Sequence, residues 1–146
     1  MQQGAKANYT GKQFERRVQI LLESTKLGMG EPPKYEAAWG TGKKRNQTDK
    51  WLKDKDIQIE LKWQAVSGTC DLKPFAELWN ANQKINCVQY ILVLGGPHWD
   101  TDRGNNIYKE AKIMADVLNA GAARSGAKKL SVMKFSEFKE WIHEQS

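Results

Sequence analysis

Three residues in the middle of the chain have the types and spacing needed for metal-assisted chemistry on a phosphate. They are Asp49, Glu60 and Lys62. Two carboxylates held close together disfavour each other's ionisation unless a cation compensates them. Mg²⁺ binds proteins through one or two carboxylates, often together with a substrate phosphate. We therefore expect Asp49 and Glu60 to hold Mg²⁺ or Mn²⁺, with the main-chain carbonyl of Leu61 completing the metal site. Lys62 would act on the attacking water or stabilise charge on the phosphate.

The convergence of these residues depends on the register of one predicted hairpin. The stretch "DIQIELKWQ" at residues 56–64 alternates apolar and polar side chains, which predicts a strand at 57–64 with Glu60 and Lys62 on one polar face. A second strand is predicted at 48–52, and a tight turn at 53–56 would pair Leu52 with Ile57. Asp49 would then lie opposite Glu60. A turn longer or shorter by one residue would move Asp49 to the other face of the sheet.

The remaining elements alternate in type along the chain. Hydrophobic spacing predicts helices at 10–24, 74–84, 107–119 and 136–144, and further strands at 35–39, 88–94 and 130–133. The strand at 88–94 is almost wholly apolar, as in a central strand covered on both faces. Thr10 and Gln13 form a capping-box pattern at the start of the first helix. Residues 66–73 and 95–106 are predicted loops. This order indicates an α/β or α+β domain, with a central mixed β-sheet flanked by helices.

Composition is consistent with one domain that spans residues 1–146. The chain has 40% hydrophobic residues, a formal net charge of +6 and a pI near 9.3, which favours a polyanionic partner. There is no apolar run long enough for a membrane span and no signal-peptide pattern at the start. The two cysteines, Cys70 and Cys87, have no metal-like spacing. We therefore expect reduced thiols and a cytoplasmic location, with no membrane partner.

Basic and small polar residues flank the hairpin on both sides. Six of them are candidates for DNA-phosphate contacts: Lys43, Lys44, Arg45, Ser67, Thr69 and Lys73. An ordinary solvated loop explains each group equally well. His98 with Asp100 and Asp102 could form a second metal cluster, although a polar turn accounts for the same residues.

The stretch "TDKWLKDKDIQIELKWQ" at residues 48–64 resembles the PD-(D/E)xK motif of restriction-endonuclease-like nucleases. Asp49 is followed by ten residues and then by Glu60, Leu61 and Lys62; the residue before Asp49 is threonine, where the family motif has proline. The resemblance covers roughly residues 10–96. It implies a restriction-endonuclease-like core and Mg²⁺-dependent hydrolysis of phosphodiester bonds. It also implies catalytic roles for Glu15 on the first helix and for Gln64.

These observations together predict a Mg²⁺-dependent DNA endonuclease. A homodimer is expected, because two-fold symmetry matches the symmetry of duplex DNA. Two alternatives remain open: a Holliday-junction resolvase-like nuclease and a DNA-binding module without catalytic activity. If Glu60 and Lys62 lie on a polar face, alanine substitution of either should abolish cleavage and leave the fold largely intact.

Overall fold

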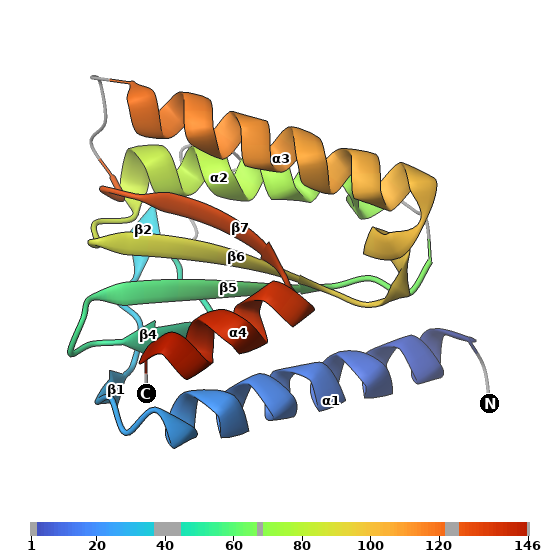
Figure 1. The fold of residues 1–146 in the computed structure, drawn as a ribbon, viewed down its shortest axis with the longest axis horizontal. Helices are drawn as coiled ribbons and strands as arrows, with labels where there is room; N and C mark the ends of the chain where they lie inside the picture. The colour runs from blue at the N-terminus through green and yellow to red at the C-terminus, as the bar shows by residue number, and fades with distance from the viewer. Residues whose placement is uncertain (1–2, 37–44, 67–68, 122–125, 146) are drawn as a thin grey trace.

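A five-stranded mixed sheet lies between two layers of helices in the computed structural model, which describes residues 3–36, 45–66, 69–121 and 126–145. Helices α2 (Lys73–Lys84) and α3 (Asp102–Ala120) cover one face, and α1 (Gln3–Ser24) and α4 (Phe135–Gln145) cover the other (Figure 1). The structure confirms the predicted class, a mixed sheet flanked by helices. None of the described helices combines the length and apolar character needed to cross a bilayer.

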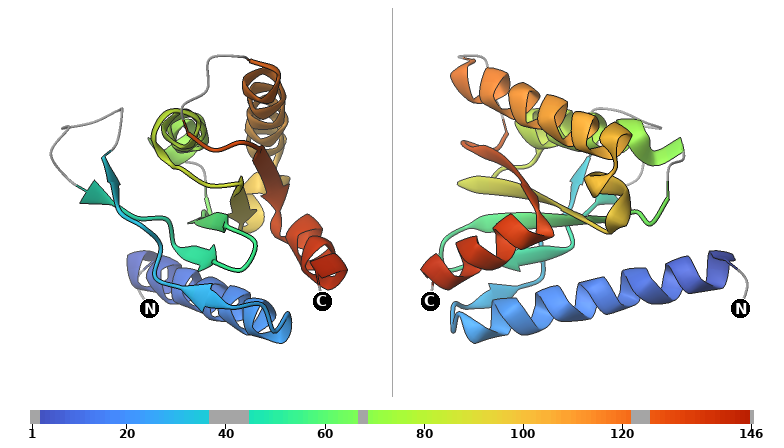
Figure 2. Two further views of the ribbon diagram at one scale, coloured as in Figure 1. Left: turned by 90° about the vertical axis from the view of Figure 1, so that its left-hand side faces the viewer. Right: turned by 45° about the vertical axis from the view of Figure 1, so that its right-hand side comes forward.

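The strand order in the main sheet is β1-β4-β5-β6-β7. Strands β1, β4 and β5 pair antiparallel, whereas β5, β6 and β7 run parallel. A separate pair, β2 with β3, projects to one side of the main sheet (Figure 2). The bounds of the strands, in chain order from β1 to β7, are Met29–Gly30, Tyr35–Glu36, Arg45–Asn46, Lys50–Leu52, Ile57–Trp63, Gln89–Gly95 and Leu130–Lys134. Two short 3₁₀ helices, η1 (Thr69–Leu72) and η2 (Pro97–Asp100), precede α2 and α3.

The hairpin formed by β4 and β5 has the predicted register. Leu52 pairs with Ile57 and Lys50 pairs with Ile59 across a turn at residues 53–56. Asp56 in this turn has a φ of 53°, a left-handed conformation that aspartate tolerates better than most residues. One further step along the same register brings Asp49 opposite Glu60.

Strand β6 is buried on both faces, as its apolar sequence predicts. Tyr90, Leu92 and Leu94 pack in the core beneath α2 and α3. Ile91 and Val93 alternate with them and pack in the core beneath α1 and α4. The central strand therefore separates the two hydrophobic cores of the domain.

The polar face of β5 is buried over its first half, at Gln58 and Glu60. Ile57 and Ile59 pack in the core beneath α1 and α4. The alternate side chains, Gln58 and Glu60, face the α2 and α3 layer and retain only 1% and 8% of their exposure. The Thr48 hydroxyl donates a 2.9 Å hydrogen bond to the side-chain oxygen of the buried Gln58. The sequence pattern shows that this face is polar but contains no information on the layer that covers it.

Two helices begin earlier than their hydrophobic spacing indicates. Helix α1 starts at Gln3, so Thr10 lies inside the helix and the predicted capping box is wrong. Helix α3 starts at Asp102 rather than at residue 107. Thr101 caps it, because its hydroxyl accepts a hydrogen bond from the Gly104 N–H at 3.1 Å. The apolar periodicity begins only at Ile107, which explains why the polar first turn was predicted to be a loop.

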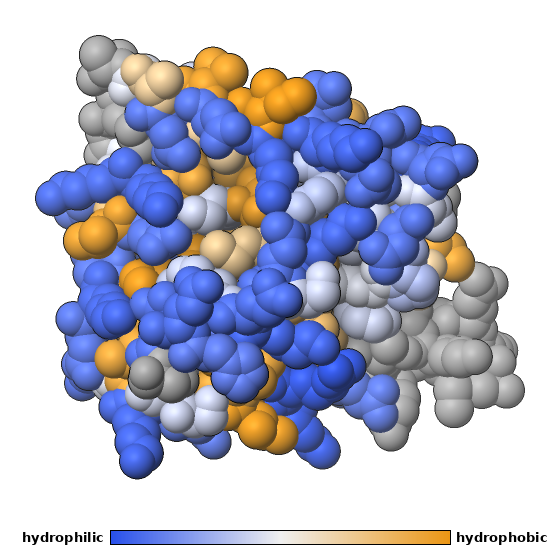
Figure 3. Space-filling model, in the orientation of Figure 1, coloured by the Kyte–Doolittle hydropathy of each residue, from blue (hydrophilic) through white to orange (hydrophobic). Residues whose placement is uncertain are grey.

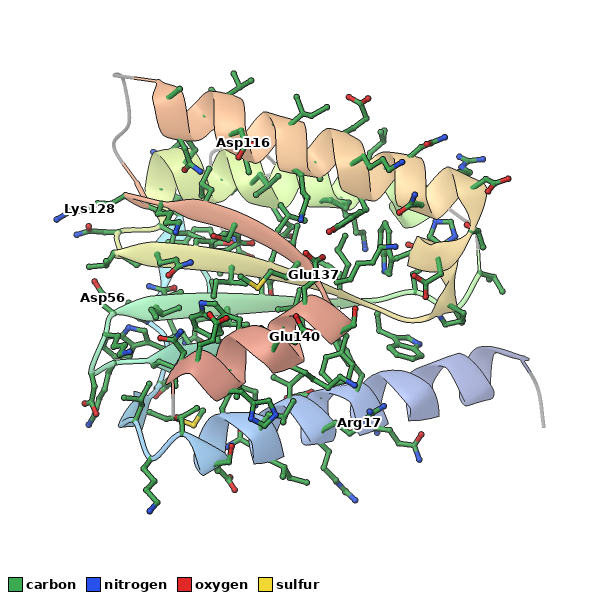
Figure 4. The ribbon with its side chains drawn as sticks, viewed as in Figure 1. Arg17, Asp56, Asp116, Lys128, Glu137 and Glu140 are labelled. Carbon is green, nitrogen blue, oxygen red and sulfur yellow. The ribbon has the colours of Figure 1, made fainter. Side chains whose placement is uncertain are left out.

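The free edge of β7 is capped by side chains from both helical layers. The Asn119 amide donates to the Leu130 carbonyl and accepts from the Leu130 N–H, at 2.9 and 2.8 Å. Glu137 accepts from the Lys134 N–H at 3.0 Å. Asp116 on α3 and Glu137 on α4 lie on opposite sides of β7 (Figure 4). These contacts satisfy backbone groups of Leu130 and Lys134 at the two ends of the edge, in place of a neighbour strand.

The face in Figure 3 is mostly hydrophilic, with several apolar areas, one of them at the top over α3. Among the residues of α3, Ile113 and Val117 are exposed, about one turn apart.

Candidate active site

Asp49 and the middle of β5 form one hydrogen-bonded unit. The Leu61 N–H donates to Asp49 Oδ2 at 2.7 Å. The Asp49 carboxyl is also hydrogen bonded to the Glu60 side chain. Since the N–H and C=O of one strand residue point to the same side, the Leu61 carbonyl also faces the Asp49 side of β5. The structure thus brings together Asp49, Glu60 and Leu61, as the sequence predicts for the metal ligands.

Glu60 is a buried carboxyl whose charged form is strongly disfavoured. Burial, the hydrogen bond to Asp49 and the negative charges of Asp49 and Glu77 raise the pKa of Glu60 to about 11, although Lys62 opposes the shift. Without a cation, Glu60 therefore carries a proton at neutral pH. A bound divalent cation would replace that proton, because its positive charge favours two ionised carboxylates.

Lys62 lies on the same face of β5 as Glu60 and forms an ion pair with Glu77 of α2. Lys62 Nζ is 3.4 Å from Glu77 Oε1, and the two side chains are 27% and 20% exposed. Burial disfavours the ammonium form, but the hydrogen bond and charge of Glu77, with smaller contributions from Glu60 and Asp49, outweigh burial and raise the pKa of Lys62. The Lys62 side chain is therefore a cation at neutral pH, suited to contact a phosphate rather than to remove a proton from water.

Two tyrosines lie against the same acidic residues. Burial and the charges of Glu60, Glu77 and Asp49 raise the pKa of both Tyr35 and Tyr90, so both are neutral phenols. The Tyr90 hydroxyl is fully buried and has no hydrogen-bond partner among the described side chains and backbone.

The carboxylate pair fits Mg²⁺ or Mn²⁺ and does not fit a closed zinc site. Within the part of the chain that the structure describes, no three His, Cys, Asp or Glu side chains come together as a metal-binding group. Two carboxylates and a main-chain carbonyl leave half of the octahedral positions of Mg²⁺ to water and substrate oxygens, in keeping with its usual coordination. A structural zinc ion needs four protein ligands of nitrogen or sulfur type.

Glu15 lies with Lys50 and not with the carboxylate pair. Its Oε1 is 3.4 Å from Lys50 Nζ, and its side chain is 59% exposed. Lys50 pairs with Ile59, whose side chain packs beneath α1, so this ion pair lies on the α1 side of the hairpin. Among the described contacts, none joins Glu15 to Asp49, Glu60 or Lys62.

Gln64 belongs to a second polar cluster at the end of β5. Its Nε2 donates to Asp71 Oδ1 at 3.3 Å and to the Val66 carbonyl at 2.9 Å. The buried Asp71 also bonds His98 Nε2 at 2.9 Å and Arg103 Nε at 2.6 Å. Burial disfavours the Asp71 carboxylate, but the hydrogen bonds from His98 and Gln64 and the charge of Arg103 lower the pKa of Asp71 overall.

The three residues considered as a second metal cluster in the loop at 95–106 make separate contacts. His98 bonds Asp71, Asp100 forms an ion pair with Lys134 at 3.0 Å, and Asp102 begins α3. Gly96, just before η2, has a φ of 104°, and a Cβ there would collide with the Gln64 carbonyl. The chain therefore needs glycine where β6 passes Gln64.

The candidate DNA-binding residues are only partly described. Lys43, Lys44 and Ser67 lie outside the described residues, as do the side chains of Arg45 and Thr69. Arg45 begins β3, Thr69 begins η1, and Lys73 is exposed at the start of α2.

Sequence reasoning missed two residues of the site region, Glu77 and Asp71. Each contacts residues distant in sequence, on β5 or at η2, and one sequence carries no signal for such contacts. Comparisons with protein-family models, with characterised proteins and with solved structures find no match to this chain.

Proposed function

We propose that this protein is a Mg²⁺-dependent DNA endonuclease that hydrolyses phosphodiester bonds. On this proposal the mixed sheet is a restriction-endonuclease-like core, in which the β4–β5 hairpin carries the catalytic residues. The active unit is a homodimer, because cutting a duplex requires one active site for each strand.

One observation supports the proposal more than any other. The buried carboxyl of Glu60 is hydrogen bonded to the exposed carboxyl of Asp49, and Glu77 lies close enough to influence its ionisation. Stability alone does not require an acid at residue 60, because an apolar residue in its place avoids the desolvation of a carboxyl. A cation-binding role explains why a buried carboxyl lies against a second carboxyl and shares a strand face with Lys62. A non-catalytic DNA-binding module would gain nothing from carboxylates that repel phosphate.

Asp49, Glu60 and the Leu61 carbonyl would hold the metal ion. When bound, Mg²⁺ supplies a positive charge to the scissile phosphate and lowers the pKa of a bound water. Lys62, a cation at neutral pH, would contact a phosphate oxygen and stabilise the charge that develops on it. The main-chain N–H of Leu61 holds Asp49 in place for this role.

The surroundings of the hairpin suit a DNA duplex. The basic residues Lys43, Lys44 and Arg45 precede Asp49 in sequence, and Arg45 lies in the β2–β3 pair, which projects from the sheet (Figure 2). Phosphate contacts from this segment would position DNA without reading its sequence.

The test is cleavage of three DNA forms side by side: supercoiled plasmid, linear duplex and a four-way junction. Each is incubated with Mg²⁺, with Mn²⁺ and with EDTA. Metal-dependent nicking is expected, and the preferred form separates a restriction-type enzyme from a junction resolvase. Asp49→Asn, Glu60→Gln and Lys62→Met should each lower the rate at least a hundredfold, whereas Glu110→Gln, on the exposed side of α3, should not.

DNA binding, measured by fluorescence anisotropy, distinguishes a nuclease from a protein that only binds DNA. If the protein binds DNA but no metal ion induces cleavage of any form, the nuclease proposal is wrong and a non-catalytic binding module is the better description.

A further inference from the structure

We infer that Glu77 is a positioning residue, which holds the Lys62 ammonium on the face of β5 that carries Glu60. This inference rests on the proposed function, but it adds a residue from α2 that neither the hairpin pattern nor the family resemblance contains.

The contact joins two elements that are fixed independently. Lys62 lies on β5, where it pairs with Leu94 of the buried strand β6. Glu77 lies in the middle of α2, next to Leu78, which is fully buried in the core. The 3.4 Å ion pair thus spans from the sheet to the helix layer that covers it. Both ends of the contact have rigid backbones, so the contact restricts the side chain between them.

A free lysine side chain would be a poor catalytic group at this position. Its four-carbon stem has about 2 kcal/mol of rotamer entropy, so an unpaired ammonium samples many positions. The pair is three-quarters buried and is therefore less screened by solvent than a surface ion pair. Glu77 limits Lys62 to rotamers that keep the ammonium on the Glu60 face of β5. Preorganised charge of this kind is effective because the protein need not rearrange during the reaction.

Two other roles would place a carboxylate at the same point. Glu77 could be a third metal ligand, or it could stabilise only the fold. A positioning role changes the rate of the bound complex, a ligand role changes the affinity for metal, and a purely structural role changes only stability.

The experiment compares Glu77→Gln with wild-type protein and with the control Glu110→Gln, which removes the same charge from the exposed side of α3. Steady-state cleavage and Mn²⁺ titration by calorimetry are measured on each. We expect kcat to fall at least tenfold for Glu77→Gln, with KM for DNA and Kd for Mn²⁺ within about threefold of wild type. Unchanged kcat overturns the inference, and so does a Kd for Mn²⁺ that rises tenfold or more, because Glu77 would then be a ligand.

A second measurement does not depend on catalysis. Urea unfolding midpoints are compared for Lys62→Met, Glu77→Gln and the double variant. If Glu77 holds Lys62, the double variant loses less than the sum of the two single losses. Additive losses overturn the inference. A wild-type protein that cleaves no DNA overturns the proposed function, while this cycle still decides whether Glu77 fixes Lys62.

Discussion

The buried carboxyl of Glu60 should make the protein less stable at neutral pH than a neutral substitute would. The folded pKa of Glu60 is raised, so the folded state holds a proton that the unfolded chain releases above its ordinary pKa of 4.5. Between these two pKa values the folded state binds more protons than the unfolded state. The free energy of unfolding therefore falls as the pH rises above 4.5.

The loss of free energy of unfolding at pH 7 can be calculated if Glu60 stays protonated in the folded state at that pH. The unfolded carboxyl ionises at 4.5, which is 2.5 pH units below neutral. At 1.36 kcal/mol for each unit, the folded state loses about 3 kcal/mol relative to a neutral side chain. Glutamine is neutral in both states and can donate to Asp49 as the protonated carboxyl does. We expect Glu60→Gln to be more stable than wild type by about this amount at pH 7.

Urea unfolding in EDTA at several pH values tests this prediction. With a urea dependence of about 1–3 kcal/mol/M, the midpoint of Glu60→Gln should rise by about 1–3 M at pH 7. The difference should shrink toward zero as the pH falls below 4.5, where the unfolded carboxyl is also protonated. Glu110→Gln is the control, and it should show little change at any pH, since its side chain is exposed.

A saturating divalent cation should reverse the order of stability. A ligand at a thousand times its Kd stabilises the folded state by about 4.1 kcal/mol, which exceeds the advantage of Glu60→Gln, and only wild type retains both carboxylates. If Glu60→Gln is less stable than wild type in EDTA at pH 7, or if the difference does not vary with pH, the reasoning about the buried proton is wrong.

Two further predictions concern the surroundings of the site. Asp71→Asn should lower the free energy of unfolding by about 2 kcal/mol in urea at pH 7, because it weakens a buried hydrogen-bonded cluster. Since the folded pKa of Asp71 is lowered, this contribution is present above the unfolded value of 3.8 and is lost as the pH falls through the folded pKa, so the variant and wild type should converge in acid. The double substitution Lys43→Ala with Lys44→Ala should weaken binding to all DNA sequences and reduce the slope of log K against log salt by about 2, measured by anisotropy; a loss confined to one sequence would make the pair a base reader instead.

The local part of the site was predictable from the sequence, because a hairpin is a local structure. Four polar residues between two alternating segments set the turn at 53–56, and the turn sets the pairing of Leu52 with Ile57. The contact between Asp49 and Glu60 follows from that register. Strand β6 was predictable for a similar reason, since a continuous apolar run has no polar face to expose.

The features that were missed involve contacts between distant parts of the chain or polar helix ends. Helix α3 begins with a turn whose exposed residues carry no hydrophobic period, and only the cap at Thr101 marks its start. Strands β1 and β3 have two residues each, too few for a pattern. The partners of Gln64 and Lys62 come from η1 and α2, and their contacts form only when the layers pack. The sequence predicted the polar face of β5, but it did not predict that a helix layer buries this face.

That burial changes what a substitution at the site can show. Alanine at residue 60 would remove most of a buried side chain, so lost cleavage could reflect a disturbed core as well as a lost ligand. Glutamine keeps the volume and the hydrogen bond to Asp49 and removes only the ability to become an anion. On the proposed function, Glu60→Gln should therefore be inactive and yet more stable than wild type in EDTA. A protein retains a destabilising acid where function requires it, so this combination of lost activity and gained stability is a sharper signature of a metal ligand than lost activity alone.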